Sequence, residues 1–336
     1  MRYLSALLRI LPALMLALLL CPAGAPAAAE SVPLKTGWLG EEAFPVWYAH
    51  EQGWDKEAGL DVEMLRFDSG KVFIEGMKVY KWVLAGCGIV PTVSAAFGSP
   101  FEVVAVAGDE AAANAVLARK DAKFADAASV RGRLVLCPQG TSAHYTLVQW
   151  LRSLGLTEKD VKIRFMPPEQ ALGAFRGGLG DLLVTWAPYT YAAEKEGCAL
   201  VATAADVKAS LPLVLLADRQ FAAENAELVR RFLTLYQRGA AVLAAEPDEK
   251  VVAAYVRFCK EWAGRELDAA TAREDLRAHR VYSVSEQLRL LGDGPGSLRA
   301  TLEGMAAFLA AGKAGDGGKA PELPSIRADY LQSLPQ

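Results

Sequence analysis

The residues best suited to hold a small ligand lie in one short stretch, Pro138 to Tyr145. An apolar run leads into Pro-Gln-Gly, then Thr141 and Ser142 follow, and a helical pattern begins. The first amide N–H groups of a helix lack a partner inside it and carry the positive end of its dipole. The N–H groups of Ala143 and His144, with the two hydroxyls, therefore suit an anionic group. The alternative is that Thr141 and Ser142 only cap the helix.

The surrounding sequence supplies the elements that would position this stretch. The run before it is typical of a buried strand, and Gly155 lies where a helix C-terminal cap is expected. His144 would add charge toward an anion if protonated; the alternative is a first-turn histidine that faces solvent. We therefore expect a strand, a tight turn and a helix whose apolar face is formed by Leu147, Val148, Leu151 and Leu154.

Five more residues are candidate ligand contacts because they lie near the end of an expected strand or after it. Trp186 and, more weakly, Trp38 are candidates for an apolar wall against the carbon atoms of a ligand. The alternative is that these rings pack in the core. Ser69 and Gly70 offer N–H groups, or only form a turn. Glu110 would pair with a ligand ammonium, or else is a solvated charge at the crossing between two lobes.

The sequence favours a binding protein over an enzyme. Its histidines are far apart and lie in no G-x-S-x-G, H-E-x-x-H or P-loop context: His50, His144 and His279. The cysteines that follow the N-terminal segment have irregular spacing without a zinc pattern: Cys87, Cys137, Cys198 and Cys259. We interpret them as buried free thiols and leave one disulfide open. We predict no catalytic residue, cofactor or metal.

Residues 1–29 have the pattern of a secretory signal peptide. They combine an arginine-containing start, the apolar core Leu11–Leu20 and small residues up to Ala29, where we expect cleavage. The core is too short to span a membrane stably. We do not expect lipidation at Cys21, because Leu20 rather than a small residue precedes it.

The remaining chain is long enough for two ordinary lobes. Removing 29 of 336 residues leaves 307, and taking away two arginines leaves 34 basic against 39 acidic residues, a net charge of −5. A mildly acidic chain without a basic block is a poor nucleic-acid binder. We expect a soluble monomer.

Strand and helix patterns alternate, which predicts an α/β fold with parallel-type sheets and crossover helices. We expect lobe one to comprise residues 30–108 and 212–336, lobe two residues 109–211, and the hinge to be crossed twice. Ligands of such sheets collect at the carboxyl ends of strands, so the turns at 37–40, 68–70 and 88–92 should face one crevice. The expected strands are 32–40, 59–65, 82–91, 101–107, 134–137, 161–166, 180–188 and 211–217, and the helical tail at 223–245, 251–262 and 284–291 should pack on lobe one.

Several motifs in one order resemble the substrate-binding proteins of ABC importers for taurine, alkanesulfonate and nitrate. The resemblance covers roughly residues 34–220 and implies the type II periplasmic-binding-protein fold, with two lobes that close over one small ligand. Thr-Ser-Ala-His-Tyr at 141–145 and the Pro-Pro-Glu and Trp-Ala-Pro runs look most like the taurine branch. The motifs are Gly53 with Gly59-Leu60-Asp61-Val62-Glu63, Phe67-Asp68-Ser69-Gly70, Gly86-Cys87-Gly88 with Pro91, Pro138 to Tyr145, Pro167-Pro168-Glu169-Gln170, Ala174 to Asp181, and Trp186-Ala187-Pro188.

The chain departs from the family pattern at two places. Tyr80-Lys81-Trp82-Val83 stands where the family usually has Gly-x-x-Asp, and Asn114 stands where taurine-like members carry an acidic residue. Asp109 and Glu110 lie just before Asn114, so the sequence leaves open whether the ligand carries an amine.

The resemblance implies an exported, periplasmic receptor that delivers a small anionic or zwitterionic solute, taurine-like or sulfonate-like, to an ABC permease. One alternative is an enzyme on the same fold, related to thiamine-pyrimidine synthesis from pyridoxal phosphate; it should carry clustered cysteines and no export signal. Another alternative is a ligand-sensing module that docks on a membrane receptor.

Overall fold

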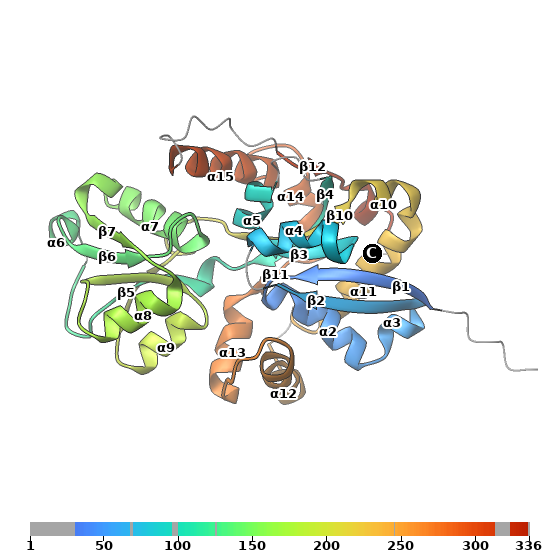
Figure 1. Ribbon diagram of the computed structural model, residues 1–336, viewed down its shortest axis with the longest axis horizontal. Coiled ribbons are helices and arrows are strands. Elements are labelled where there is room, and N and C mark those ends of the chain that lie inside the picture. The colour runs from blue at the N-terminus through green and yellow to red at the C-terminus, as the bar shows by residue number, and fades with distance from the viewer. Residues whose placement is uncertain are drawn as a thin grey trace, which may run out of the picture.

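The computed structural model describes residues 31–67, 70–95, 100–124, 126–244, 246–312 and 323–334. The expected signal segment 1–29, Ser69 and the Gly-rich segment 315–321 lie outside them. The described chain forms two lobes, each built around its own sheet with helices packed on it (Figure 1).

The sheet of lobe one has the strand order β11-β4-β10-β3-β1-β2, and β12 also pairs with β4. Strand β1 runs parallel to β2 and β3, whereas β10 runs antiparallel to β3 and β4. All nine residues of β4 are buried, which agrees with the apolar run Val103–Ala107 at its centre. The strands are β1 (Val32–Trp38), β2 (Leu60–Arg66), β3 (Leu84–Gly88), β4 (Phe101–Asp109), β10 (Pro212–Asp218), β11 (Arg280–Val281) and β12 (Ser325–Ile326).

The sheet of lobe two has the order β7-β6-β8-β5-β9. Strand β6 is parallel to β7 and β8, and β5 is antiparallel to β8 and β9. The α/β fold is confirmed, but the sheets are mixed rather than purely parallel. Two antiparallel members, β5 and β10, arrive directly from the other lobe without a crossover helix, and β11 pairs antiparallel with β4 after α13. The strands are β5 (Asn114–Ala118), β6 (Leu134–Cys137), β7 (Lys162–Phe165), β8 (Leu182–Trp186) and β9 (Ala199–Thr203).

The helices follow the expected apolar periodicity in most places. Helix α8 begins at Pro168, where proline fits the first turn because its missing N–H has no partner there. The long helices after β10 pack on the lobe-one core, as predicted. Lobe one contains η3 (Glu41–Ala43), α2 (Phe44–Glu51), α3 (Trp54–Glu57), α4 (Gly70–Tyr80), α5 (Ile89–Ala95), α10 (Arg219–Glu224), α11 (Ala226–Ala241), α12 (Glu249–Arg257) with the π-helical turn η6 (Phe258–Trp262), α13 (Ala269–Ala278), α14 (Val284–Leu291), α15 (Leu298–Gly312) and α16 (Asp329–Gln332).

Lobe two has a smaller set of helices, which cover both faces of its sheet. Ala143, Leu147 and Leu151 of α7 pack on one face. Leu172 and Phe175 of α8 pack on the other face. The helices are η4 (Ala111–Ala113), α6 (Ala127–Val130), α7 (Ser142–Ser153), η5 (Glu158–Asp160), α8 (Pro168–Arg176) and α9 (Tyr189–Lys195).

Two short connections join the lobes, and Asp109 ties them together. Its Oδ1 accepts the N–H of Ala111 at 2.7 Å, and its Oδ2 accepts the hydroxyl of Ser210 at 2.8 Å and the N–H of Leu211 at 3.1 Å. Ala111 lies on the outgoing connection, and Ser210 and Leu211 lie on the returning one. Because one carboxylate bonds to both, the crossing has a defined geometry. The lobe boundaries themselves stay a prediction.

Helices α13 and α15, which the sequence patterns did not identify, also reach lobe two. In Figure 1, α13 lies below and α15 above the junction of the lobes. The ring of Phe308 on α15 lies 5.1 Å from that of His144 and 5.3 Å from that of Tyr145, both on α7. None of the described helices is long and apolar enough to cross a bilayer.

Candidate ligand-binding site

The turn between β6 and α7 has the geometry of a capped helix start. Gly140 adopts φ +68°, the left-handed region that glycine enters readily. Thr141 is extended at the N-cap position, where its Oγ1 accepts the N–H of His144 at 3.4 Å and donates to the carbonyl of Pro138 at 2.8 Å. The Thr141 hydroxyl is therefore already used within the turn.

Ser142 and Ala143 are the residues of this turn with free donors. Within the part of the chain that the structure describes, neither their backbone N–H groups nor the Ser142 hydroxyl has a hydrogen-bond partner. Ser142 is half-buried and Ala143 is buried. These groups lie at the positive end of a twelve-residue helix, where a negative charge is favoured.

His144 is only 5% exposed. The alternative that this first-turn histidine faces solvent is therefore wrong. Its Nδ1 accepts the N–H of Gly140 at 3.1 Å, which places the ring proton on Nε2, 2.8 Å from Oε1 of Glu158. The ring also contacts Phe165 and Phe308 edge-on. His144 therefore orders the turn, and both its ring nitrogens are satisfied within the protein.

Trp186 ends β8 at the edge of the lobe-two sheet that faces lobe one. It is half-buried, pairs in register with Asn114 of β5, and packs edge-on against Tyr189 with ring centroids 6.2 Å apart. Its role as an apolar wall stays a prediction, and its position is compatible with that role.

The structure does not bring Trp38 to a surface. Its side chain is fully buried, its indole N–H donates to Oγ1 of Thr36 at 2.8 Å, and its ring stacks on that of Tyr236 at 6.3 Å. Trp38 thus packs in the lobe-one core, and we leave it out of the site proposed below. Gly70 is the first residue of α4.

Glu110 lies at the crossing, directly against lobe one. Its Oε1 is so near Gly88, the last residue of β3, that a Cβ there would approach it to 3.2 Å. Burial raises the pKa of Glu110 to about 8; His279 opposes this shift and Glu42 adds to it. The neighbouring Asn114 is fully buried and donates from Nδ2 to the Glu110 carbonyl at 3.1 Å. Among the described residues, its Oδ1 has no hydrogen-bond partner.

Sequence reasoning missed an acidic loop after β1. Glu42 accepts the N–H groups of Leu39 and Gly40 on Oε1, at 3.0 and 2.9 Å, and thereby shapes the loop. Burial, with the adjacent charge of Glu41, raises the pKa of Glu42 to about 7. The signal was present in the sequence, because the pair directly follows a turn assigned to the crevice.

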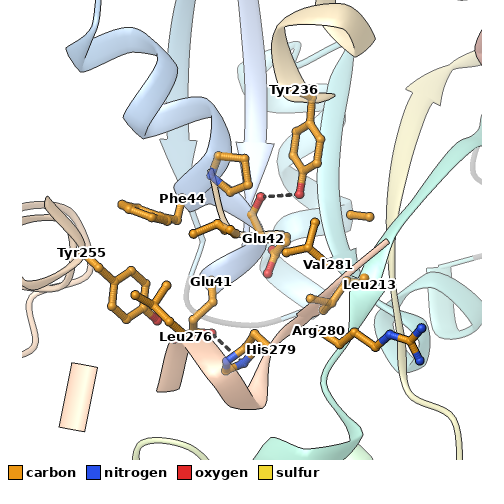
Figure 2. Close-up of a pocket in the computed structure, with 14 residues that line it drawn as sticks. Glu41, Glu42, Phe44, Leu213, Tyr236, Tyr255, Leu276, His279, Arg280 and Val281 are labelled. Atoms are coloured by element: carbon orange, nitrogen blue, oxygen red, sulfur yellow. Dashed lines mark hydrogen bonds and ion pairs between the residues drawn. The ribbon is translucent and has the colours of Figure 1, made fainter. Parts of the chain in front are cut away.

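Glu41 and Glu42 line a cavity of about 30 Å³ in lobe one, together with Tyr236, Tyr255 and His279 (Figure 2). Glu41 forms an ion pair with Arg265, and Nε2 of His279 lies 3.9 Å from Oε2 of Glu41. Burial disfavours the charged imidazole of His279, but Asp275 and then Glu41 outweigh it and raise its pKa to about 10. Arg265 lies in the loop before α13 and His279 directly after that helix, both far along the chain, so no local pattern could link them to Glu41.

The two lobes therefore present opposite polarities. Lobe two offers unpartnered amide donors at the first turn of α7, and lobe one offers the carboxyl group of Glu42. Glu110 adds a second carboxyl group at the crossing, directly against Gly88 of lobe one. Among the described residues, no group of histidine, cysteine, aspartate or glutamate side chains is arranged to hold a metal ion. All four cysteines that follow the N-terminal segment are free thiols, and Cys198 alone is not fully buried.

The fold agrees with the comparison to known families. The chain belongs to the NMT1/THI5-like family, whose model matches residues 41–250.

Two named relatives share about a quarter of their aligned residues with this chain. A Bacillus subtilis (strain 168) protein, whose name gives aliphatic sulfonates as its candidate ligands, is 26% identical over 206 residues, 60% of this chain and 62% of that protein. An Escherichia coli K12 protein of the same name is 25% identical over 228 residues, 67% and 72% of the two chains. The match thus spans less than two thirds of the first relative. The crystal structure of the E. coli periplasmic aliphatic sulphonate binding protein SsuA superposes with TM-score 0.70 at 20% identity, over 90% of this chain and 96% of that one.

These likenesses confirm the periplasmic-binding-protein fold expected from the sequence. The names of the B. subtilis and E. coli relatives describe binding proteins.

Proposed function

We propose that the protein is an exported solute-binding receptor of an ABC importer, and that it captures a small zwitterionic or anionic solute of the taurine or alkanesulfonate type. The observation that carries this proposal is the opposite polarity of the two lobes. The N–H groups of Ser142 and Ala143 suit a sulfonate or carboxylate, and Glu110 suits an ammonium group. The names of the relatives support the sulfonate class.

Lobe closure is the step that would supply affinity. Moving α7 toward the β3 end of lobe one would enclose the ligand between donors and carboxyl groups and remove its water. Charge-assisted hydrogen bonds are strong in such an enclosed site, because water no longer competes for them. Trp186 would then cover the ligand's carbon atoms, which favours a short alkyl chain over a bare inorganic anion.

The raised pKa values of Glu42 and Glu110 support a ligand with a positive end. Carboxylates that are buried near one another are held partly protonated, and an ammonium group between them would stabilise their charged forms. Among the ligands expected from the sequence, a zwitterion such as taurine therefore ranks above nitrate, which brings only negative charge.

The cellular role follows from the proposed class. A periplasmic location after cleavage near Ala29, a membrane permease as the partner and a monomeric state are all part of the proposal. A ligand-sensing role would use the same closure, and the presence of permease and ATPase genes beside the gene for this protein distinguishes the two.

A thermal-shift panel tests the ligand class. Taurine, alkanesulfonates, nitrate, amino acids and pyrimidines are added separately to the protein that begins at Glu30. A ligand at a hundred times its Kd stabilises the folded state by about 2.7 kcal/mol, which raises Tm measurably. We expect taurine or an alkanesulfonate to raise Tm. No shift with any member would overturn the ligand class, and an absorbance band from a pyridoxal phosphate aldimine in a parallel sample would favour an enzyme instead.

A further inference from the structure

A buried hydrogen bond joins the two lobes away from the connecting strands. The hydroxyl of Tyr191, on α9 of lobe two, donates to Oδ1 of Asp275 on α13 at 3.1 Å. Tyr191 is 7% exposed and Asp275 is fully buried. Helix α13 belongs to lobe one, because Ala272 and Leu276 join its core. The bond therefore crosses the boundary between the lobes.

Lobe one fixes the other side of the Asp275 carboxylate. The hydroxyl of Tyr255, on α12, donates to Oδ2 at 2.8 Å, and Nδ1 of His279 lies 3.2 Å from Oδ1. Burial and the Asp275 charge raise the pKa of Tyr191 well above its usual range, so the phenol keeps its proton. Asp275 is thus a fixed acceptor, and Tyr191 is the donor that lobe two contributes to it.

The surroundings of Tyr191 exclude water from this bond. Ala113 and Ala187 of lobe two pack around the ring, and Ala278 at the end of α13 packs against them. A hydrogen bond in such a dry setting is stronger than one in water. Lys195 and Asp268, 2.5 Å apart, continue the contact along α13, but both side chains are more than half exposed and the pair contributes little.

Asp275 also leads to the acidic loop of the candidate site. It holds His279, whose Nε2 lies 3.9 Å from Glu41, and Glu41 starts the short helix that contains Glu42. The polar side chains therefore form a continuous series from Tyr191 in lobe two to the loop after β1 in lobe one. A change in the angle between the lobes that breaks the Tyr191 bond would act on the same carboxylate that positions His279.

We propose that Asp275 is a positioning residue that sets the angle between the lobes, and that its bond to Tyr191 limits how far the ligand-free protein opens. Helix α13 packs against the outgoing connection at Ala111–Ala113, where it would stop an opening rotation of the lobes. This inference concerns the protein without ligand and does not depend on which solute it binds.

Two conservative variants, Tyr191→Phe and Tyr255→Phe, test this inference. Each removes one hydroxyl that donates to Asp275, but the Tyr191 bond joins the lobes and the Tyr255 bond lies within lobe one. Spin labels on Lys159→Cys in lobe two and Glu224→Cys in lobe one, both exposed positions, report the interlobe distance in a Cys198→Ser background. Circular dichroism and Tm of each variant check that it is folded.

We expect the label distances of Tyr191→Phe to shift to longer values and to spread more widely, while those of Tyr255→Phe match the parent protein. The Tm values of both variants should fall, because each loses a bond to a buried carboxylate. A Tyr191→Phe distribution that superposes on the parent overturns the inference. An equal shift in both variants also overturns it, because the effect would then follow from a general loosening around Asp275. Neither outcome bears on the proposed solute, since no ligand is added.

Discussion

The backbone N–H of Gly140 donates to Nδ1 of His144 at 3.1 Å, across one turn at the start of α7. This bond sets the tautomer of the ring and directs Nε2 to Glu158. His144, the residue of this turn that could carry a positive charge toward an anion, thus has a structural role. The groups left to bind a ligand at this turn are the backbone N–H groups of Ser142 and Ala143.

Replacing His144 tests its structural role. His144→Ala removes two hydrogen bonds and the edge-on contacts with Phe165 and Phe308, so we expect the free energy of unfolding to fall by about 2 to 4 kcal/mol. Urea unfolding followed by circular dichroism measures it. Gln139→Ala, at an exposed position of the same turn, is the control and should change stability little. Equal stabilities for the two variants would contradict the role.

Glu110 is predicted to bind the ammonium group of the ligand. In Glu110→Gln the affinity for taurine should fall about tenfold or more, because a charge-assisted hydrogen bond is lost. The affinity for ethanesulfonate, which lacks the amine, should stay the same. Titration calorimetry of both ligands against both proteins measures the difference. An equal loss for the two ligands would show that Glu110 acts on the fold and not on the amine.

Stability should fall as pH rises from about 5 to 8. Burial raises the pKa of Glu42 to about 7 and that of Glu110 to about 8, so the folded state retains protons that the unfolded state releases above its pKa of 4.5. Unfolding then releases protons, and rising pH favours it until these carboxyls ionise in the folded state. His279 acts in the same direction above pH 6.5, since its pKa is raised to about 10.

Urea unfolding at several pH values measures this dependence. Glu42→Gln removes one of the groups while it keeps an acceptor for Leu39 and Gly40, and should flatten the curve by up to about 3 kcal/mol. Glu303→Gln, at an exposed position of α15, should leave the curve unchanged. Stability that is constant or rises between pH 5 and 8 would be inconsistent with the buried carboxyls.

Gly239 permits the close crossing of α11 and α2. A Cβ at this position would lie 2.1 Å from the carbonyl oxygen of Pro45, so Gly239→Ala should force the helices apart and destabilise the protein by about 1 to 3 kcal/mol. Gly304 of α15 has open space around it, and Gly304→Ala should be neutral or stabilise by up to about 1 kcal/mol through helix propensity. The two melting temperatures, compared with that of the parent protein, check the contrast.

The sequence predicts the elements whose signals are local. The run Leu134–Cys137 is β6, helix α7 starts at Ser142, and Gly155, with φ +69°, follows its C-terminus as expected. Pro168 likewise opens α8. In each case a proline, glycine or hydroxyl residue marks a boundary beside a clear apolar pattern.

Other features depend on partners that are distant in the chain. Trp38 ends a strand, where a ligand contact is expected, but Tyr236 of a much later helix covers its ring. Helix α13 contains two buried residues that are not apolar, Thr271 and Asp275, so its apolar stripe is weak. The role of Asp275 becomes visible only when Tyr191 and Tyr255 are placed beside it.

The most direct test of the central claim is titration calorimetry of Ser142→Pro with the sulfonate that raises Tm most in the parent protein. Ser142 is the first residue of α7, where proline is tolerated, so the variant loses the amide donor and the hydroxyl but should keep the helix. Ser142→Ala, which loses the hydroxyl alone, is the matched control. We predict that Ser142→Pro melts like the parent protein and binds at least about tenfold more weakly, with Ser142→Ala between the two. A Ser142→Pro protein that binds the sulfonate with the parental Kd would contradict an anion site at this turn.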